Sequence, residues 1–202
     1  MRMRAGFGAA LCAVALVMGL SAPSATAADA TASPRHTPTV QKVDNAVPLA
    51  DAARDPKSDR AAAAAASHVV NQGSNKCLAV PGGSTAKGTG LVQWPCGTWR
   101  DHYWTAEPWS INGAVYYRFV NANSGQCLAV PGGSTKAGTQ VIQWPCGTWA
   151  DHFWGVTTDG KGLHLFNYYS GQCLGVEGGS LADGAKAIQW GCGTWADHYW
   201  WF

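Results

Sequence analysis

Three near-copies of one sequence pattern fill the chain from residue 77 onward, and this repeat constrains the fold more than any other feature. Each copy opens with Cys-Leu, passes a Gly-Gly-Ser turn, reaches a Gln-Trp-x-Cys stretch and closes on an aromatic residue and a tryptophan. The copies begin at Cys77, Cys127 and Cys173, so matched positions are 50 and then 46 residues apart. Units this short bury a core only by stacking on one another. The repeat therefore predicts one pseudo-threefold domain with up to three equivalent surface sites.

The local pattern from residue 67 onward indicates β-structure. Short runs rich in β-branched and aromatic residues, such as 115–120, 126–130 and 140–144, alternate with Gly-, Pro- and Ser-rich turns. No segment sustains an apolar period of 3.6 residues, so few helices are expected. About four short strands per copy, stacked as three leaves, would close a barrel without free edges. We expect an all-β fold, a β-trefoil, whose last strand at 200–202 pairs with the strand containing His68.

The first 66 residues differ in composition from the rest. Residues 1–27 combine two early arginines, an apolar core at 5–20 and a small-residue cleavage site, which is typical of a secretory signal peptide. The apolar core is short for a membrane span and no second one follows, so we expect a secreted, extracellular protein; an uncleaved anchor is the alternative. Residues 28–66 are rich in Ala, Asp, Thr and Pro with almost no aromatics, which favours a disordered linker or, as an alternative, a pro-segment.

Six cysteines remain beyond the signal peptide, two in each copy and 19 residues apart. An even number in an exported chain indicates disulfides. Pairing within each copy preserves the symmetry, and each bridge would contribute about 3 kcal/mol by loop entropy. The spacing lacks the short Cys-x2-Cys knuckles of structural zinc sites, so no metal is expected. The expected pairs are Cys77 with Cys96, Cys127 with Cys146, and Cys173 with Cys192.

Charge and residue pattern argue against nucleic-acid binding and catalysis. Acidic and basic residues balance between 67 and 202 and the basic ones do not cluster, whereas nucleic acid requires a basic stripe. Most glycosidases need two carboxylates, and each copy offers one well-placed Asp. An Asp-His pair recurs without a matching Ser or Cys nucleophile. We therefore expect neither an enzyme nor a cofactor.

The assembled pattern resembles the ricin B-chain type of lectin, the β-trefoils also called family 13 carbohydrate-binding modules. The resemblance covers 67–202 and is carried by Cys-Leu-x-Val, by the Gln-Trp-Pro-Cys or Gln-Trp-Gly-Cys strand and by the terminal aromatic-Trp pair. It implies a monomeric lectin that binds neutral glycans or polysaccharide at up to three shallow sites. Two departures stand out. The family's Asp two residues after the first cysteine is replaced by Ala79, Ala129 and Gly175, and its Asn-Gln-x-Trp reads Asp-His-x-Trp here.

Sugar binding needs an apolar platform for the C–H face of a pyranose and planar polar groups for its hydroxyls. Four positions in each copy are the candidates: a Trp for stacking, an Asp for hydroxyls, a His that donates or holds the Asp, and a Gln with a lesser part. The predicted binding residues are Trp94, Trp144, Trp190, Asp101, Asp151, Asp197, His102, His152, His198, Gln93, Gln143 and Gln189.

Competing interpretations apply to several of these positions. The tryptophans of the first set could pack rather than stack, the Asp-His pairs could tie loops to backbone amides, and the histidines are expected to point outward at strand ends. Glu177 breaks the Pro-Gly-Gly pattern, which leaves the activity of the third site open. A protein-recognising scaffold, such as an inhibitor or toxin-associated factor, is the alternative function, with 105–113 as its distinctive loop.

Two further sets of tryptophans complete the repeat. The resemblance implies that the terminal set is structural, and the Cys-Gly-Thr-Trp set could cover the disulfides from the core or from the rim. These sets are Trp104, Trp154 and Trp200, and Trp99, Trp149 and Trp195.

Overall fold

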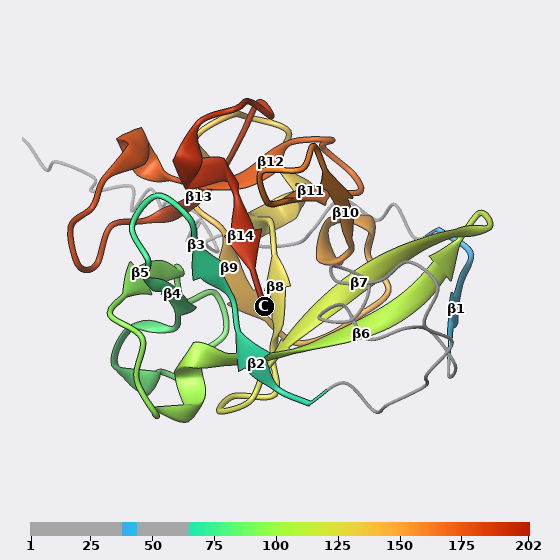
Figure 1. The fold of residues 1–202 in the computed structure, drawn as a ribbon. Coiled ribbons are helices and arrows are strands. Elements are labelled where there is room, and N and C mark those ends of the chain that lie inside the picture. Colours follow the sequence, from blue (N-terminus) through green and yellow to red (C-terminus); the bar gives the residue numbers. More distant parts are fainter. Residues whose placement is uncertain (1–37, 44–64) are drawn as a thin grey trace, which may run out of the picture. The chain divides into compact units, whose positions relative to one another are not determined.

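The computed structural model describes residues 38–43 and 65–202. The predicted signal peptide and most of the predicted linker lie outside these residues. The described part is all-β, with fourteen strands in one hydrogen-bonded sheet and six single-turn 3-10 helices (Figure 1). No helix in this part has the length and apolar character that a membrane crossing requires.

The strands are β1 (Val40–Lys42), β2 (Ser67–His68), β3 (Val70–Asn71), β4 (Cys77–Ala79), β5 (Val92–Trp94), β6 (Tyr103–Ile111), β7 (Ala114–Asn121), β8 (Cys127–Ala129), β9 (Ile142–Trp144), β10 (Trp154–Thr158), β11 (Leu163–Asn167), β12 (Cys173–Val176), β13 (Ala187–Trp190) and β14 (Trp200–Trp201). The 3-10 helices are η1 (Pro81–Gly83), η2 (Arg100–His102), η3 (Pro131–Gly133), η4 (Ala150–His152), η5 (Glu177–Gly179) and η6 (Ala196–His198).

Seven strands close the predicted barrel at six positions, because β2 and β3 together occupy one of them. Antiparallel pairing runs from β2 through β6, β7, β10, β11 and β14 to β3, and β3 follows β2 directly in the chain. The C-terminal strand β14 pairs with Val70 and Asn71, whereas His68 pairs with Tyr103 of β6. The expected closure by the chain end is therefore confirmed, but its partner lies two residues beyond His68.

Three hairpins, one per leaf, cover one end of the barrel: β4–β5, β8–β9 and β12–β13. Residues at the start of their second strands, or one position before it, bond to one another in a ring. The amide of Leu91 donates to Val141, Val141 to Ala187 and Ala187 back to Leu91, at 2.9, 3.0 and 3.0 Å. All three residues are fully buried. The leaves thus meet at a pseudo-threefold axis, as the repeat predicts.

The core is built from the same positions of each leaf. Trp104, Trp154 and Trp200 are fully buried, and each indole Nε1–H donates to the carbonyl of the leucine in its leaf's Cys-Leu pair, at 2.9, 3.2 and 3.0 Å. Buried indole donors require such partners. The prediction that this set is structural is confirmed. The three disulfides also form within each leaf, with Cα–Cα distances of 5.0, 5.0 and 4.9 Å.

One leaf departs from the symmetry. The predicted loop 105–113 is wrong: its first seven residues continue β6, and a turn at Asn112 (φ 52°) and Gly113 (φ 83°) leads into β7. Both positive φ values match a two-residue Asn-Gly hairpin turn. This long hairpin extends beyond the other strands and leaves an edge of β6, on which β1 pairs (Figure 1). The prediction of disorder is therefore wrong for Val40–Lys42, because an open edge supplies hydrogen-bond partners that composition does not reveal.

Candidate functional site

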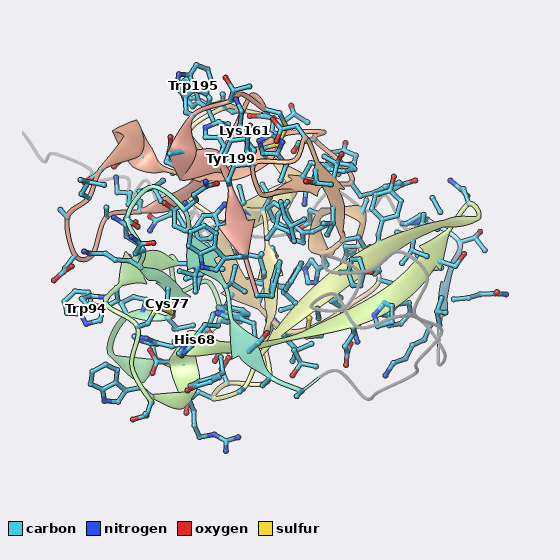
Figure 2. All side chains as sticks on the ribbon, in the orientation of Figure 1. His68, Cys77, Trp94, Lys161, Trp195 and Tyr199 are labelled. Carbon is cyan, nitrogen blue, oxygen red and sulfur yellow. A yellow bond between two sulfur atoms is a disulfide. The ribbon has the colours of Figure 1, made fainter. Side chains whose placement is uncertain are left out.

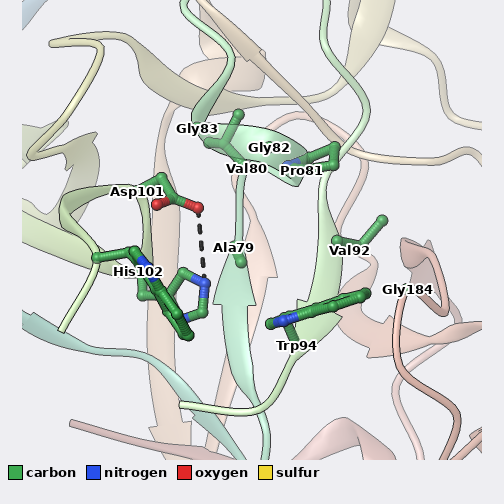
Figure 3. Close-up of a pocket in the computed structure, with 11 residues that line it drawn as sticks. Ala79, Val80, Pro81, Gly82, Gly83, Val92, Trp94, Asp101, His102 and Gly184 are labelled. Atoms are coloured by element: carbon green, nitrogen blue, oxygen red, sulfur yellow. Dashed lines mark ion pairs between the residues drawn. The ribbon is translucent and has the colours of Figure 1, made fainter. Parts of the chain in front are cut away.

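A hollow of about 690 Å³ opens in the first leaf (Figure 3). Figure 3 shows the Asp101 carboxylate and the His102 ring on one side and the Trp94 indole on the other. A matched hollow of about 400 Å³ lies in the third leaf. Each is bounded by a glycine from a neighbouring leaf, Gly184 in the first and Gly138 in the third. Each site is therefore assembled by two leaves.

The floor of the first hollow comes from β4 and the turn after it, and its walls from β5, the Trp99 turn and η2. The lining residues are Ala79, Val80, Pro81, Gly82, Gly83, Val92, Trp94, Trp99, Asp101, His102 and Gly184.

The Asp-His pair is presented by a single 3-10 turn. In η2 the backbone amide of His102 donates to the carbonyl of Trp99 at 3.1 Å. A buried asparagine from the following leaf fixes this turn: the Asn121 side chain donates to the carbonyl of Asp101 at 2.9 Å and accepts the backbone amides of Asn123 and Ser124 at 3.1 and 3.2 Å.

The other leaves repeat this brace. Asn167 donates to the Asp151 carbonyl at 2.8 Å and Asn71 to the Asp197 carbonyl at 2.7 Å. Sequence reasoning missed these asparagines. The signal was present, because an Asn-x-x-Ser pattern recurs just before each copy.

The Asp and His side chains lie against each other without a hydrogen bond. The His Nε2 to Asp Oδ2 distances are 3.6, 3.8 and 3.6 Å in the three leaves. The histidines are buried, so the prediction that they point outward is wrong. The 3-10 turn places each imidazole with its ring centroid 5.1–5.3 Å from that of the tryptophan three residues earlier.

Burial keeps the three imidazoles neutral at neutral pH. Desolvation lowers the pKa of His102 and His198, although Asp101 and Asp197 oppose it. In the second leaf desolvation, assisted by the positive charge of Arg118, lowers the pKa of His152 to about 4. The imidazole of each site is consequently a neutral neighbour of the Asp carboxylate.

The stacking candidates of the first and third leaves lie at the surface. Trp94 is 43% exposed and Trp190 46%, and both line the hollows. Trp144 is partly buried, with the Lys87 ammonium 5.4 Å from its ring centroid. Figure 2 shows Trp94 and Trp195 projecting from the ribbon at separate places.

The second tryptophan of each hollow lies on the rim. Trp99 and Trp195 are both 59% exposed and line the same hollows as Trp94 and Trp190. Each packs on the glycine of its Cys-Gly-Thr-Trp turn: a Cβ at Gly97 would lie 2.1 Å from the Trp99 ring. The glycine is required for this close approach, so the open question of core or rim is answered in favour of the rim for these two.

The three glutamines play another part. Gln93, Gln143 and Gln189 are fully buried, and each Oε1 accepts a serine hydroxyl of its own leaf at 2.7 Å. The Gln93 amide donates to the carbonyls of Ser180 and Ala182 at 2.7 and 2.9 Å. These carbonyls belong to the loop that carries Gly184. The glutamines therefore position the wall supplied by the neighbouring leaf, and they do not line either hollow.

The replaced family Asp also has a physical explanation. Ala79 and Ala129 are 1% exposed beneath the sites. At the matched Gly175, even a Cβ would lie 3.0 Å from the His198 ring and 3.5 Å from the Asp197 carboxylate. A longer side chain there would collide with the Asp-His pair. The Asp197 carboxylate on the 3-10 turn thus lies close to the place that an Asp side chain at position 175 would take.

Glu177 leaves the third leaf's turn unchanged. Gly178 has φ 63° and ψ 19°, and the matched Gly82 has φ 61° and ψ 19°. The Glu177 carboxylate faces solvent and lies 3.4 Å from the Lys186 ammonium.

Comparison with known proteins agrees with this geometry. A designed 3-fold symmetric protein, ThreeFoil, has 30% identity and a TM-score of 0.62, covering 66% of this chain and 94% of that chain. An exo-beta-1,3-galactanase from Clostridium thermocellum has 26% identity and a TM-score of 0.62, covering 67% of this chain but only 29% of its own. The Rhizoctonia solani agglutinin shares the fold, with 14% identity, a TM-score of 0.59 and coverages of 72% and 98%. No curated protein matches the chain.

The family comparison covers more than half of the sequence. The family described as "Ricin-type beta-trefoil lectin domain-like" matches residues 60–110 and 102–190. Together with the closed trefoil, this match shows that the chain belongs to the ricin-type β-trefoil lectin-like domain family.

Proposed function

We propose that this protein is a secreted lectin that binds neutral glycans or polysaccharide at up to three shallow sites. The observation that carries the proposal is the exposed Trp94 indole facing the Asp101 carboxylate across an open hollow, repeated in the third leaf as Trp190 and Asp197. An indole face takes the apolar side of a sugar ring, and a carboxylate accepts vicinal hydroxyls.

The rim tryptophan adds a second apolar wall to each hollow. A pyranose between Trp94 and Trp99 would contact indole on two sides while its hydroxyls face Asp101. Single shallow sites bind weakly, and avidity across sites raises the apparent affinity by a factor of about 10² or more when the target spaces its sugars suitably. Multivalent binding to a polysaccharide or a cell surface follows from this arrangement.

Catalysis is not part of the proposal. The first hollow contains a single carboxylate, that of Asp101, whereas most glycoside hydrolases use two, about 5–9.5 Å apart. In the third hollow Glu177 lies beside Asp197, but its carboxylate is paired with the Lys186 ammonium at 3.4 Å. The nearby His is neutral and lies at 3.6 Å from the carboxylate, longer than a hydrogen bond.

The test uses the whole chain, expressed with its leader and secreted, on a glycan array and in polysaccharide pull-downs. Trp94→Ala and Asp101→Asn should each reduce retention, and combining Trp94→Ala with Trp190→Ala should reduce it further. Trp201→Ala is the matched control, because Trp201 is similarly exposed (39%) but lies outside the hollows. Unchanged retention in both Trp94→Ala and Asp101→Asn would remove the site assignment.

The alternative of a protein-recognising scaffold is favoured by one observation, the asymmetric β6–β7 hairpin. Its Val115 is 48% exposed next to the turn at Asn112, and no other leaf has a hairpin of this length. This function predicts no retention on any glycan and a protein partner whose binding is lost in Val115→Asp. Glycan retention that is insensitive to Val115→Asp would exclude it.

A further inference from the structure

The three leaves differ in the residue beside the stacking tryptophan, and this difference predicts what the second leaf binds; the inference rests on the proposed lectin function. Each stacking tryptophan lies against a glycine from a neighbouring leaf's loop, at 3.4–3.6 Å from an ideal Cβ on that glycine. The pairs are Trp94 with Gly184, Trp144 with Gly88, and Trp190 with Gly138. The residue before the glycine therefore lies next to the edge of the indole ring.

That residue is different in each leaf. At Trp94 it is Asp183, whose carboxylate is paired with the Lys76 ammonium at 3.1 Å. At Trp190 it is Ala137, which carries no charge. At Trp144 it is Lys87, whose ammonium lies 5.4 Å from the indole centroid and forms no ion pair with any described residue. Only the second leaf thus has an unpaired cation beside its stacking ring in the part of the chain that the structure describes.

Arg118 of β7 also reaches this leaf, where it donates to the Gly147 carbonyl at 3.3 Å, but its guanidinium is paired with the Glu107 carboxylate at 2.6 Å, which leaves Lys87 as the cation that carries the inference. The matched positions in the other leaves are His68 and His164, which hold the equivalent glycine carbonyls at 3.0 Å.

The acid of the second leaf is also withdrawn from solvent. The Asp151 side chain is 3% exposed, against 12% for Asp101 and 16% for Asp197. The acid that all three leaves share is therefore least accessible in the leaf whose stacking tryptophan has Lys87 beside it.

We propose that the second-leaf site selects sugar rings that carry a carboxylate, with Lys87 as the residue that determines this preference. A uronic acid bears its carboxylate on the pyranose ring, so a ring stacked on Trp144 brings that group within reach of an ammonium held near the indole edge. The flexible four-carbon stem of lysine lets the ammonium leave the indole and meet the carboxylate. The first and third leaves, without a free cation at this edge, take neutral rings.

The experiment isolates the second leaf in the full chain with Trp94→Ala and Trp190→Ala. The probes are polygalacturonate, alginate and hyaluronan, each beside its carboxyl-reduced, neutral form, and binding is measured by biolayer interferometry at low and high salt. We expect retention on at least one acidic polymer, about fivefold weaker binding to its reduced form, and a similar loss when Lys87→Ala is added. The acidic preference should also vanish at about 1 M salt, where the Debye length is about 3 Å.

Lys136→Ala is the matched control, because Lys136 is also an exposed lysine and lies on the equivalent loop of the second leaf, whose Gly138 packs on Trp190 and not on Trp144. It should leave binding unchanged. The inference is overturned if the isolated second-leaf site binds none of the three acidic polymers, or if binding to an acidic polymer survives Lys87→Ala. It is also overturned if Lys87→Ala increases binding to the neutral forms, because the lysine would then block the indole. Neutral-glycan binding by the unmodified chain with any of these results would leave the lectin proposal standing; loss of all glycan binding by the unmodified chain would refute both.

Discussion

Replacing Asn121 with alanine should destabilise the fold and disable the first site together. Asn121 is 1% exposed; it donates to the Asp101 carbonyl at 2.9 Å and accepts two backbone amides at 3.1 and 3.2 Å. Each lost intramolecular hydrogen bond costs about 1 kcal/mol net, and groups left unsatisfied in the interior cost more. Three such bonds give a loss of about 3 kcal/mol in the free energy of unfolding, and at about 3 °C per kcal/mol the melting temperature should fall by about 10 °C.

The measurement is urea unfolding followed by tryptophan fluorescence, with circular dichroism as a second probe. Asn123→Ala is the matched control, since Asn123 is exposed in the same turn and donates only to the Gly83 carbonyl at 2.9 Å. It should cost less than about 0.5 kcal/mol. A loss below 0.5 kcal/mol in Asn121→Ala, or equal losses in both variants, would refute the role of the buried brace.

Three further predictions concern pH, the rim and the core. The pKa of His152 is about 4 in the folded state and about 6.5 in the unfolded state, so between these pH values the unfolded chain binds more protons. The free energy of unfolding should therefore fall by up to about 3 kcal/mol between pH 7 and pH 4, and the fall should be smaller in His152→Gln. Gly193→Ala places a Cβ 2.0 Å from the Trp195 ring, so it should displace that ring and lower glycan binding at the third site without changing the melting temperature. Gly191→Ala is the control, because the space around its Cβ is open, and it should change neither glycan binding nor the melting temperature. Equal effects of the two substitutions would contradict the packing of Trp195 on Gly193. Trp154→Phe removes an indole donor to a buried carbonyl and should cost about 1–3 kcal/mol in chemical unfolding; a neutral result would contradict the buried bond.

The sequence predicted those features that repeat in every leaf and involve strong local patterns. The trefoil and the three intra-leaf disulfides follow from the threefold register, because symmetry removes most alternatives, and the buried terminal tryptophans follow from the family resemblance. The strand β1 and the long hairpin could not be predicted in this way, since they occur once and depend on an edge that exists only after folding.

The site was predicted in part. Trp94 and Asp101 are brought to one hollow, but the Gln93 side chain is buried and bonds to the neighbouring leaf, and the His102 side chain is buried rather than pointing outward. These orientations depend on a single 3-10 turn and on contacts between leaves, and neither of these produces a periodic pattern of residues in the sequence. The contribution of Gly184 to the first site is of the same kind, because it comes from a residue about 90 positions away in the chain.

The most direct test of the central claim is an NMR titration that follows the indole N–H signals of the eleven tryptophans as an array-selected glycan is added. The account predicts that the signals of Trp94, Trp99, Trp190 and Trp195 shift with the bound fraction, while those of Trp104, Trp154 and Trp200 stay in place. Shifts confined to the buried set or to Trp201, or none at a glycan concentration that saturates retention, would contradict it.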